Sequence, residues 1–169
     1  MLALATTLAI AAHPAFGWRK AGFTVRQAVG SLEASLPVLA LYCAFFVAIA
    51  LAFPSGTPTA EEAAFQLTMP EFEEEPFYRG LLLLALDRAF TGRARFLGVD
   101  WRWGAVLSCL LFGLAHAFGY SSGRFTFDAI TMALTALPAF MGVWLRLRTD
   151  SVLLPILAHN FGNSVSLVV

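Results

Sequence analysis

Charged side chains are scarce in this chain of 169 residues. Asp, Glu, Lys and Arg make up 13% of it, whereas 59% is hydrophobic, and the mean hydropathy is +0.73. One core of this size could not bury so much apolar surface, and so little charge would not keep the remainder in solution. The composition therefore excludes an ordinary water-soluble domain and favours a protein whose solvent is the lipid bilayer.

The chain also has no net charge and no cysteine motif for binding a metal. Eleven basic and eleven acidic residues cancel, and no basic stripe interleaved with aromatic residues points to a nucleic-acid partner. Cys43 and Cys109 lie inside apolar stretches, where a thiol behaves as a small hydrophobe, and neither has the Cys-x-x-Cys spacing of a metal site. No internal repeat, low-complexity segment or long linker divides the chain. We therefore expect a single transmembrane domain, residues 1–169, with no nucleic-acid partner.

Long apolar runs are what the sequence has in place of charge. A helix needs roughly 17 to 25 residues to cross about 30 Å of hydrocarbon. We therefore predict an all-α, polytopic transmembrane helix bundle of about six spans, with N-terminal spans in residues 1–53 and a motif-bearing core in residues 71–169. The candidate spans are Met1 to about Phe16, Leu36 to Phe53, Glu71 to Phe90, Trp101 to Phe118, Phe125 to Leu147 and Ser151 to Val169. The first of them is short and is interrupted by His13 and Pro14.

Basic residues are distributed unequally between the loops of this layout. Short cytoplasmic loops carry the excess of Lys and Arg, and here the excess follows the first, third and fifth spans. The opposite side has only Arg124, together with Glu61 and Glu62. Both chain ends are therefore expected on the non-cytoplasmic face, and the short loops favour a bacterial inner membrane. The clustered basic residues are Arg19, Lys20, Arg26, Arg88, Arg93, Arg95, Arg102, Arg146 and Arg148.

Polar and ionisable residues recur at a spacing of four within three of the apolar runs. Residues four apart share a helix face, and an ionisable group in hydrocarbon is expensive, so it marks a functional site. With a rise of about 1.5 Å per residue, the predicted topology places all three motifs in the outer half of the membrane. We expect one active-site cavity within the membrane, on the non-cytoplasmic side. The residues are Glu74, Glu75, Tyr78 and Arg79; Phe112 and His116; and His159 and Asn163.

These motifs resemble those of the CAAX protease and bacteriocin-processing family, which are glutamic intramembrane endopeptidases. The family pattern is Glu-Glu-x-x-x-Arg, then Phe-x-x-x-His, then His-x-x-x-Asn or Asp, on successive membrane helices. The match runs from Glu74 to Asn163. The resemblance implies an endopeptidase without a cofactor, which cuts a peptide bond near the end of a membrane-associated protein or peptide.

The resemblance and the chemistry of peptide hydrolysis together suggest roles. The reaction needs a base to activate water, donors for the developing oxyanion and an acid for the leaving amine. Glu74 is expected to be the base, assisted by His116. His159 and Asn163 are expected to donate hydrogen bonds to the scissile carbonyl. Two adjacent carboxylates in a low dielectric cannot both ionise cheaply, so the Arg79 cation is expected to keep its neighbouring glutamate ionised.

Other interpretations of the same residues stay open. The Glu and His side chains could bind zinc, which activates water itself, although no His-Glu-x-x-His is present. A non-enzymatic immunity factor or proton-coupled carrier could use buried Glu and His to relay protons or bind a partner peptide. An ion pair that only stabilises the helix also explains Glu75 and Arg79. Four other acidic residues, Glu61, Glu62, Glu71 and Glu73, are expected to form a solvated loop.

Overall fold

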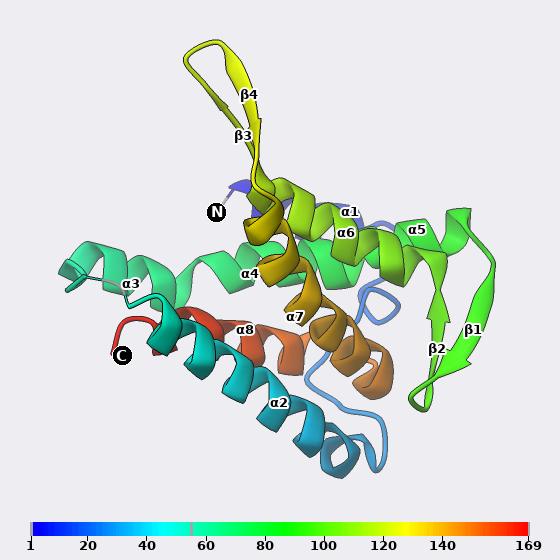
Figure 1. Ribbon diagram of the computed structural model, residues 1–169. Helices are drawn as coiled ribbons and strands as arrows, with labels where there is room; N and C mark the ends of the chain where they lie inside the picture. Colours follow the sequence, from blue (N-terminus) through cyan, green and yellow to red (C-terminus); the bar gives the residue numbers. More distant parts are fainter. Residues whose placement is uncertain (1, 55, 169) are drawn as a thin grey trace.

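The computed structural model describes residues 2–54 and 56–168, and helices make up most of it (Figure 1). Their boundaries follow from the apolar runs and from the turn residues between them. The helices are α1 (Leu2–Ala12), α2 (Ser31–Ala52), α3 (Ala60–Thr68), α4 (Pro70–Glu75), the π-helix η1 (Pro76–Leu82), α5 (Leu83–Ala89), α6 (Trp103–Ala117), α7 (Ala129–Thr149) and α8 (Leu153–Val165).

Two β-hairpins separate some of these helices, so the all-α prediction was wrong in this respect. Strand β1 (Arg93–Phe96) pairs antiparallel with β2 (Val99–Arg102), and β3 (Phe118–Ser121) pairs with β4 (Arg124–Phe127). Both loops have two residues, and both residues of each have positive φ, which matches the twist of the strands. Figure 1 shows β3 and β4 projecting away from the helices. Strands of four residues are too short for their alternation to stand out in the sequence.

Two helices among the described residues, α2 and α7, are long and apolar enough to cross a membrane. Only 17% of the apolar window of α2 is buried within the protein, whereas a core helix of a soluble protein is mostly covered. The six expected spans are not all long helices, because α1 ends before His13 and the fifth expected span begins inside β4. Met1 and Val169, the outer bounds of the first and last expected spans, lie outside the described residues.

The hydrophobic core forms on both sides of α7, which crosses between α6 and α2 in Figure 1. A Cβ atom on Gly113 would lie only 2.8 Å from the Cβ atom of Ala136, so the glycine allows α6 and α7 to approach closely, as small residues do between membrane helices. The core residues are Leu83, Ala105, Cys109, Phe112, Ala139 and Val143 on one side, and Tyr42, Val99, Trp144, Leu145 and Ala158 on the other.

Candidate functional site

The first motif lies where the chain passes from α4 into the π-helix η1. Glu74 and Glu75 end α4, and Pro76 begins η1. A proline has no N–H and its ring crowds the carbonyl four residues earlier, so it disrupts the regular hydrogen-bond ladder. The helix continues with π spacing through Tyr78 and Arg79. Such π segments are rare and are frequent at functional sites, and Pro76 was the sequence signal for this one.

Glu75 is the acceptor at the centre of a buried polar cluster. It is 1% exposed, and its Oε1 atom lies 2.9 Å from Nδ1 of His159 and 3.2 Å from Nη1 of Arg79. Both partners are buried too. A buried carboxylate without partners would be costly, and here the hydrogen bond from His159 and the charge of Arg79 compensate it. This cluster fixes the position of α8 against α4 and η1.

The contact with Glu75 also orients His159. A carboxylate oxygen accepts hydrogen bonds, so Nδ1 of His159 carries the proton of this bond. The other ring nitrogen, Nε2, then turns towards Glu74, whose Oε2 atom lies 3.9 Å away. Neighbouring glutamates thus meet opposite nitrogens of one imidazole.

His116 reaches Glu74 from α6. Its Nδ1 atom donates to the carbonyl oxygen of Phe112, one helical turn earlier, at 2.8 Å, because a carbonyl can only accept. Its Nε2 atom is therefore unprotonated when the ring is neutral, and it lies 3.9 Å from the same Oε2 atom of Glu74. The Glu74 side chain is 30% exposed, and its Oε2 atom has no hydrogen-bond partner within the described chain. Two imidazoles thus face one carboxylate oxygen from two helices.

The Phe112 ring joins the polar groups of the site. Its centroid lies 4.5 Å from that of His116 and 5.9 Å from that of His159. The guanidinium carbon of Arg79 lies 4.1 Å from the same ring centre, within the range of a cation–π interaction. Tyr78 packs edge-on against Phe112, with centroids 5.0 Å apart. One aromatic ring thus contacts both histidines and the arginine, which sets their spacing.

Asn163 lies one turn beyond His159 on α8 and is half-buried. Four residues apart, the two side chains share a face of the helix. Its backbone carbonyl accepts a hydrogen bond from the hydroxyl of Ser166, whereas its side-chain amide makes none with any described residue. The amide can therefore bind a ligand on the His159 side of α8.

Glu71 and Asn160 form a second polar contact, which sequence reasoning missed. Glu71 was expected in a solvated loop, but it is completely buried, because α4 begins before it and packs against α8. The Nδ2 atom of Asn160 donates to Oε1 of Glu71 at 2.6 Å and to the carbonyl oxygen of Leu67 at 2.8 Å. Asn160 thus ties α8 to both α3 and α4. Neither residue belongs to a spaced motif. Glu71 lies three residues before Glu74 and Asn160 directly follows His159, and this nearness to the motifs is the only sequence signal for the contact.

The other acidic residues of this region differ from one another. Glu61 and Glu62 are exposed, as expected. Glu62 closes a capping box with Thr59 at the start of α3, and these hydrogen bonds lower the pKa of its carboxyl group. Glu73 is half-buried rather than solvated. The expected acidic loop is therefore two helices, and its solvated part is confined to the beginning of α3.

The described residues also show how the possible metal ligands are placed. No three His, Cys, Asp or Glu side chains among residues 2–54 and 56–168 are arranged to hold a metal ion. Glu74, His116 and His159 face one another, and each imidazole nitrogen is 3.9 Å from the carboxylate oxygen. The zinc interpretation consequently has no ready ligand set in the described residues.

All three motifs lie inside a region that matches a known protein family. The family is described as type II CAAX prenyl endopeptidase Rce1-like, and its model matches residues 34–165. The matched region is most of the chain and runs from α2 to the end of α8. The comparison with curated proteins and the comparison with solved structures gave no match.

Proposed function

Because the chain belongs to the type II CAAX prenyl endopeptidase Rce1-like family, we propose that it hydrolyses peptide bonds with a water activated by Glu74. Membership makes the protein a membrane protease of the CAAX type, whose substrate is a peptide or protein in the membrane. The proposed bond lies near the end of that substrate. The observation that carries this mechanism is the position of Glu74, with Oε2 3.9 Å from Nε2 of both His116 and His159.

The distances at Glu74 suit a bound water. A separation of 3.9 Å is too long for a direct hydrogen bond, but a water between such groups can hydrogen-bond to all of them. Glu74 takes a proton from this water while the water oxygen attacks the scissile carbonyl carbon. The unprotonated Nε2 of His116 holds the same water by accepting its second hydrogen. Two acceptors thus orient the water for attack.

His159 and Asn163 stabilise the oxyanion that forms. The carboxylate of Glu75 accepts from Nδ1 of His159 and so directs Nε2 towards the site. When Nε2 carries a proton, it donates a hydrogen bond to the oxyanion. The side-chain amide of Asn163 is the second donor, and it does not titrate. Arg79 keeps Glu75 ionised. Glu74 then gives this proton to the leaving amine. Glu75 takes no part in the proton transfer.

We also propose that the shorter apolar helices lie in the membrane with α2 and α7, giving about six spans. His116 and Asn163 lie near the C-terminal ends of α6 and α8. Arg102 precedes the start of α6, and further basic residues lie in the last turns of α5 and α7. This separation supports a site on the non-cytoplasmic side of a bacterial inner membrane, with the basic ends in the cytoplasm. A peptide that is exported or tethered to the membrane suits this side.

Cleavage by the purified protein in liposomes tests the mechanism. A library of membrane-anchored peptides is incubated with wild type, with Glu74→Gln and with Glu61→Gln as the matched control, since Glu61 is an exposed carboxylate outside the site. We expect cleavage by wild type and Glu61→Gln that resists a zinc chelator, and none by Glu74→Gln. Full activity of Glu74→Gln would remove Glu74 as the base. Loss of wild-type cleavage on chelation would replace the glutamic mechanism with a zinc-dependent one.

A further inference from the structure

A cavity of about 680 Å³ lies at the end of the helices away from Glu74. The end of α5, the β1–β2 hairpin, the end of α7 and the segment before α2 line it. Basic residues outnumber the aspartates Asp87, Asp100 and Asp150 in its wall two to one, so an anion is the favoured occupant. The basic residues are Lys20, Arg88, Arg95, Arg102, Arg146 and Arg148.

Arg146 shows that this charge is built into the fold rather than spread over a solvated loop. Its side chain is 7% exposed. The Nη2 atom donates to the carbonyl oxygen of Lys20 at 2.9 Å, and Gly22 packs so closely that a Cβ atom there would clash with Nε. Its nearest carboxylate partner, Asp150, is 3.9 Å away and largely exposed. A buried cation with so weak a partner is costly, which points to an anionic ligand.

Asp87 and Asp150 both attract the Arg146 cation, but among the described residues only Asp150 forms an ion pair with it. Asp100 pairs with Arg95 at 3.8 Å, and both are exposed. The Oδ1 atom of Asp87 faces Gly104 at the start of α6, where an acid is favourable because of the helix dipole. The Nε atom of Arg148, like that of Arg146, is buried without a hydrogen-bond partner among the described residues. Two arginines in the cavity wall therefore each keep one donor that no described residue satisfies.

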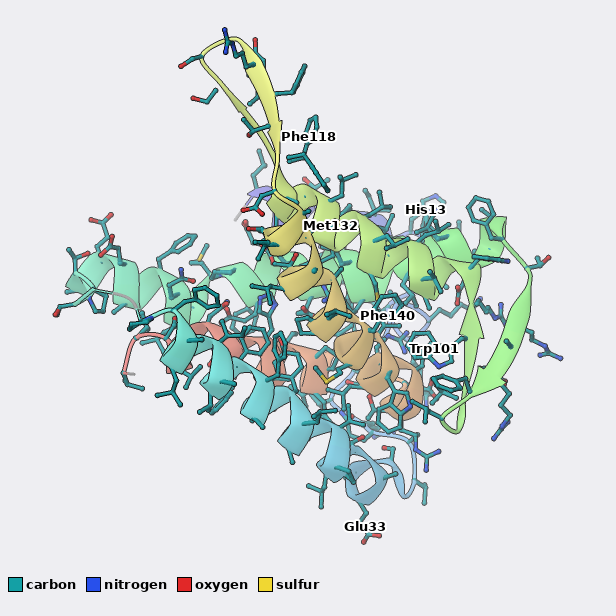
Figure 2. All side chains as sticks on the ribbon, viewed as in Figure 1. His13, Glu33, Trp101, Phe118, Met132 and Phe140 are labelled. Carbon is teal, nitrogen blue, oxygen red and sulfur yellow. The ribbon has the colours of Figure 1, made fainter. Side chains whose placement is uncertain are left out.

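An apolar groove of about 520 Å³ lies on the other side of the β1–β2 turn. The turn separates the two spaces, since Leu97 lines the groove and Gly98 lines the basic cavity. Trp144 donates from Nε1 to the carbonyl oxygen of Leu97 at 2.9 Å and holds the turn in place. Figure 2 shows Trp101 and Phe140 between β2 and α7, with their ring centroids 6.0 Å apart. Val38 and Leu41 of α2 complete the groove.

We propose that the cavity and the groove together bind one anionic phospholipid. Its phosphate lies among the arginines, whose planar guanidinium groups match phosphate oxygens, and one acyl chain lies in the groove. Basic pockets at the cytoplasmic ends of membrane helices recognise anionic headgroups in this way. Within one turn of α7 the lining changes from apolar to basic, because Trp144 lines the groove and Arg146 lines the cavity. A lipid with an acyl chain and a charged headgroup needs such a change. The site is separate from Glu74, so the proposal does not depend on the mechanism above.

Lipid retention by the full-length protein tests this site. The protein is exchanged into nanodiscs of phosphatidylcholine containing a minority of phosphatidylglycerol, extracted into detergent, and analysed by native mass spectrometry. We expect phosphatidylglycerol to be retained about tenfold over phosphatidylcholine after correction for its share, which corresponds to one charge-assisted hydrogen bond. Equal retention of the two lipids would overturn the proposal.

Two variants with a matched control locate the headgroup. Arg148 is half-buried and has no hydrogen bond or ion pair with any described residue. Arg148→Gln is expected to lower phosphatidylglycerol retention about tenfold. Arg146→Gln should lower it further, with circular dichroism as the check on folding. Arg124→Gln removes a cation from the start of β4, outside the cavity, and should leave phosphatidylglycerol retention unchanged. A loss with Arg124→Gln equal to that with Arg148→Gln would reduce the effect to net charge and overturn the site.

The acyl chain is tested with a variant that fills the groove. Val38→Phe should lower retention of long-chain phosphatidylglycerol but leave the headgroup site intact. Soluble glycerol phosphate, added in millimolar excess, should displace little lipid, because it lacks the chain. Complete displacement by glycerol phosphate, together with normal retention by Val38→Phe, would show a site for free phosphate and overturn the lipid proposal.

Discussion

Glu74 and Glu75 are neighbours in the chain, but they meet different surroundings. Successive residues of a helix point about 100° apart, so Glu75 turns into the core and Glu74 turns towards a partly exposed space. Glu75 is held by His159 and Arg79, whereas no direct hydrogen bond within the described chain engages Oε2 of Glu74. The same side chain can thus serve structure at one position and chemistry at the next.

This difference predicts opposite consequences for the two isosteric changes. Glu75→Gln leaves the buried Arg79 cation without its partner, and it should lower the free energy of unfolding by about 3 kcal/mol. Glu74→Gln should leave the free energy of unfolding within about 0.5 kcal/mol of wild type while abolishing cleavage. Thermal unfolding in detergent, followed by circular dichroism, measures both. Equal stability of the two variants would contradict the structural role of Glu75 in the buried polar cluster with His159 and Arg79.

The helical elements are held together by contacts that are distant in sequence. Asn160 links α8 to α3 and α4 through Leu67 and Glu71, and the same stretch of α8 carries His159. Because Glu71 is completely buried, its carboxyl group depends on this amide for a hydrogen bond. The position of His159 relative to Glu74 therefore rests on the packing of α8 against α4.

Removing the Asn160 amide tests this link. Asn160→Ala should cost about 1 to 3 kcal/mol of stability, because it leaves a buried carboxyl oxygen without its donor. Cleavage should also fall, since His159 is the adjacent residue. Ser164→Ala is the matched control one turn later on α8, because its hydroxyl only donates to the backbone carbonyl of Asn160. Chemical or thermal unfolding of both variants decides the matter, and similar losses would argue against a specific role for the amide.

The π-helical segment offers a second test at the level of the element. Pro76→Ala restores an N–H where the ladder is broken, which favours regular α-helix and shifts Glu74 and Arg79 relative to each other. Displacements of about 1 Å in a site can reduce activity by about a hundredfold, so kcat/KM should fall by at least about tenfold. Pro70→Ala is the matched control, because a proline at the first position of a helix replaces no intrahelical bond. If both variants kept wild-type kcat/KM, the π segment would have no role in the site.

Across the whole molecule, two polar regions lie at opposite ends of the helices. The Glu74 site and the basic cavity are separated along α6 and α7 by apolar core. Side chains of α2 such as Leu36, Leu41 and Leu51 remain more than half exposed, which suits contact with lipid. If the helices cross a bilayer, the Glu74 site and the basic cavity face opposite sides of it, and this orientation can be measured.

Thiol labelling of intact cells tests the orientation. Ser122→Cys lies in the β3–β4 turn and should react with a membrane-impermeant reagent added from outside. Ala94→Cys lies on exposed strand β1, near the basic cavity, and should react only after the inner membrane is permeabilised. The parent protein, with Cys43 and Cys109 partly or fully buried, gives the background. The reverse pattern would place the Glu74 site on the cytoplasmic side.

Local spacing carried much of the candidate site, whereas the lengths of the elements were harder to predict. Glu75 and Arg79 lie on the continuous passage from α4 into η1, and Phe112 and His116 both lie on α6. A spacing of four was therefore sufficient to place each pair together. Hydropathy marked α2 and α7 but did not show that the fifth expected span, which starts at Phe125, begins inside strand β4. Short strands of apolar residues look like helix ends when only hydrophobicity is considered.

The sequence by itself determined the hydrophobic character, the order of the motifs and the faces within each helix, because these depend on composition and on residues a few positions apart. Only the tertiary structure decided that Glu71 is buried with Asn160, that Glu75 rather than Glu74 receives Nδ1 of His159, and that Arg146 faces a cavity. These contacts join distant segments, and which atoms meet depends on how the helices pack and turn against one another, which no local spacing specifies.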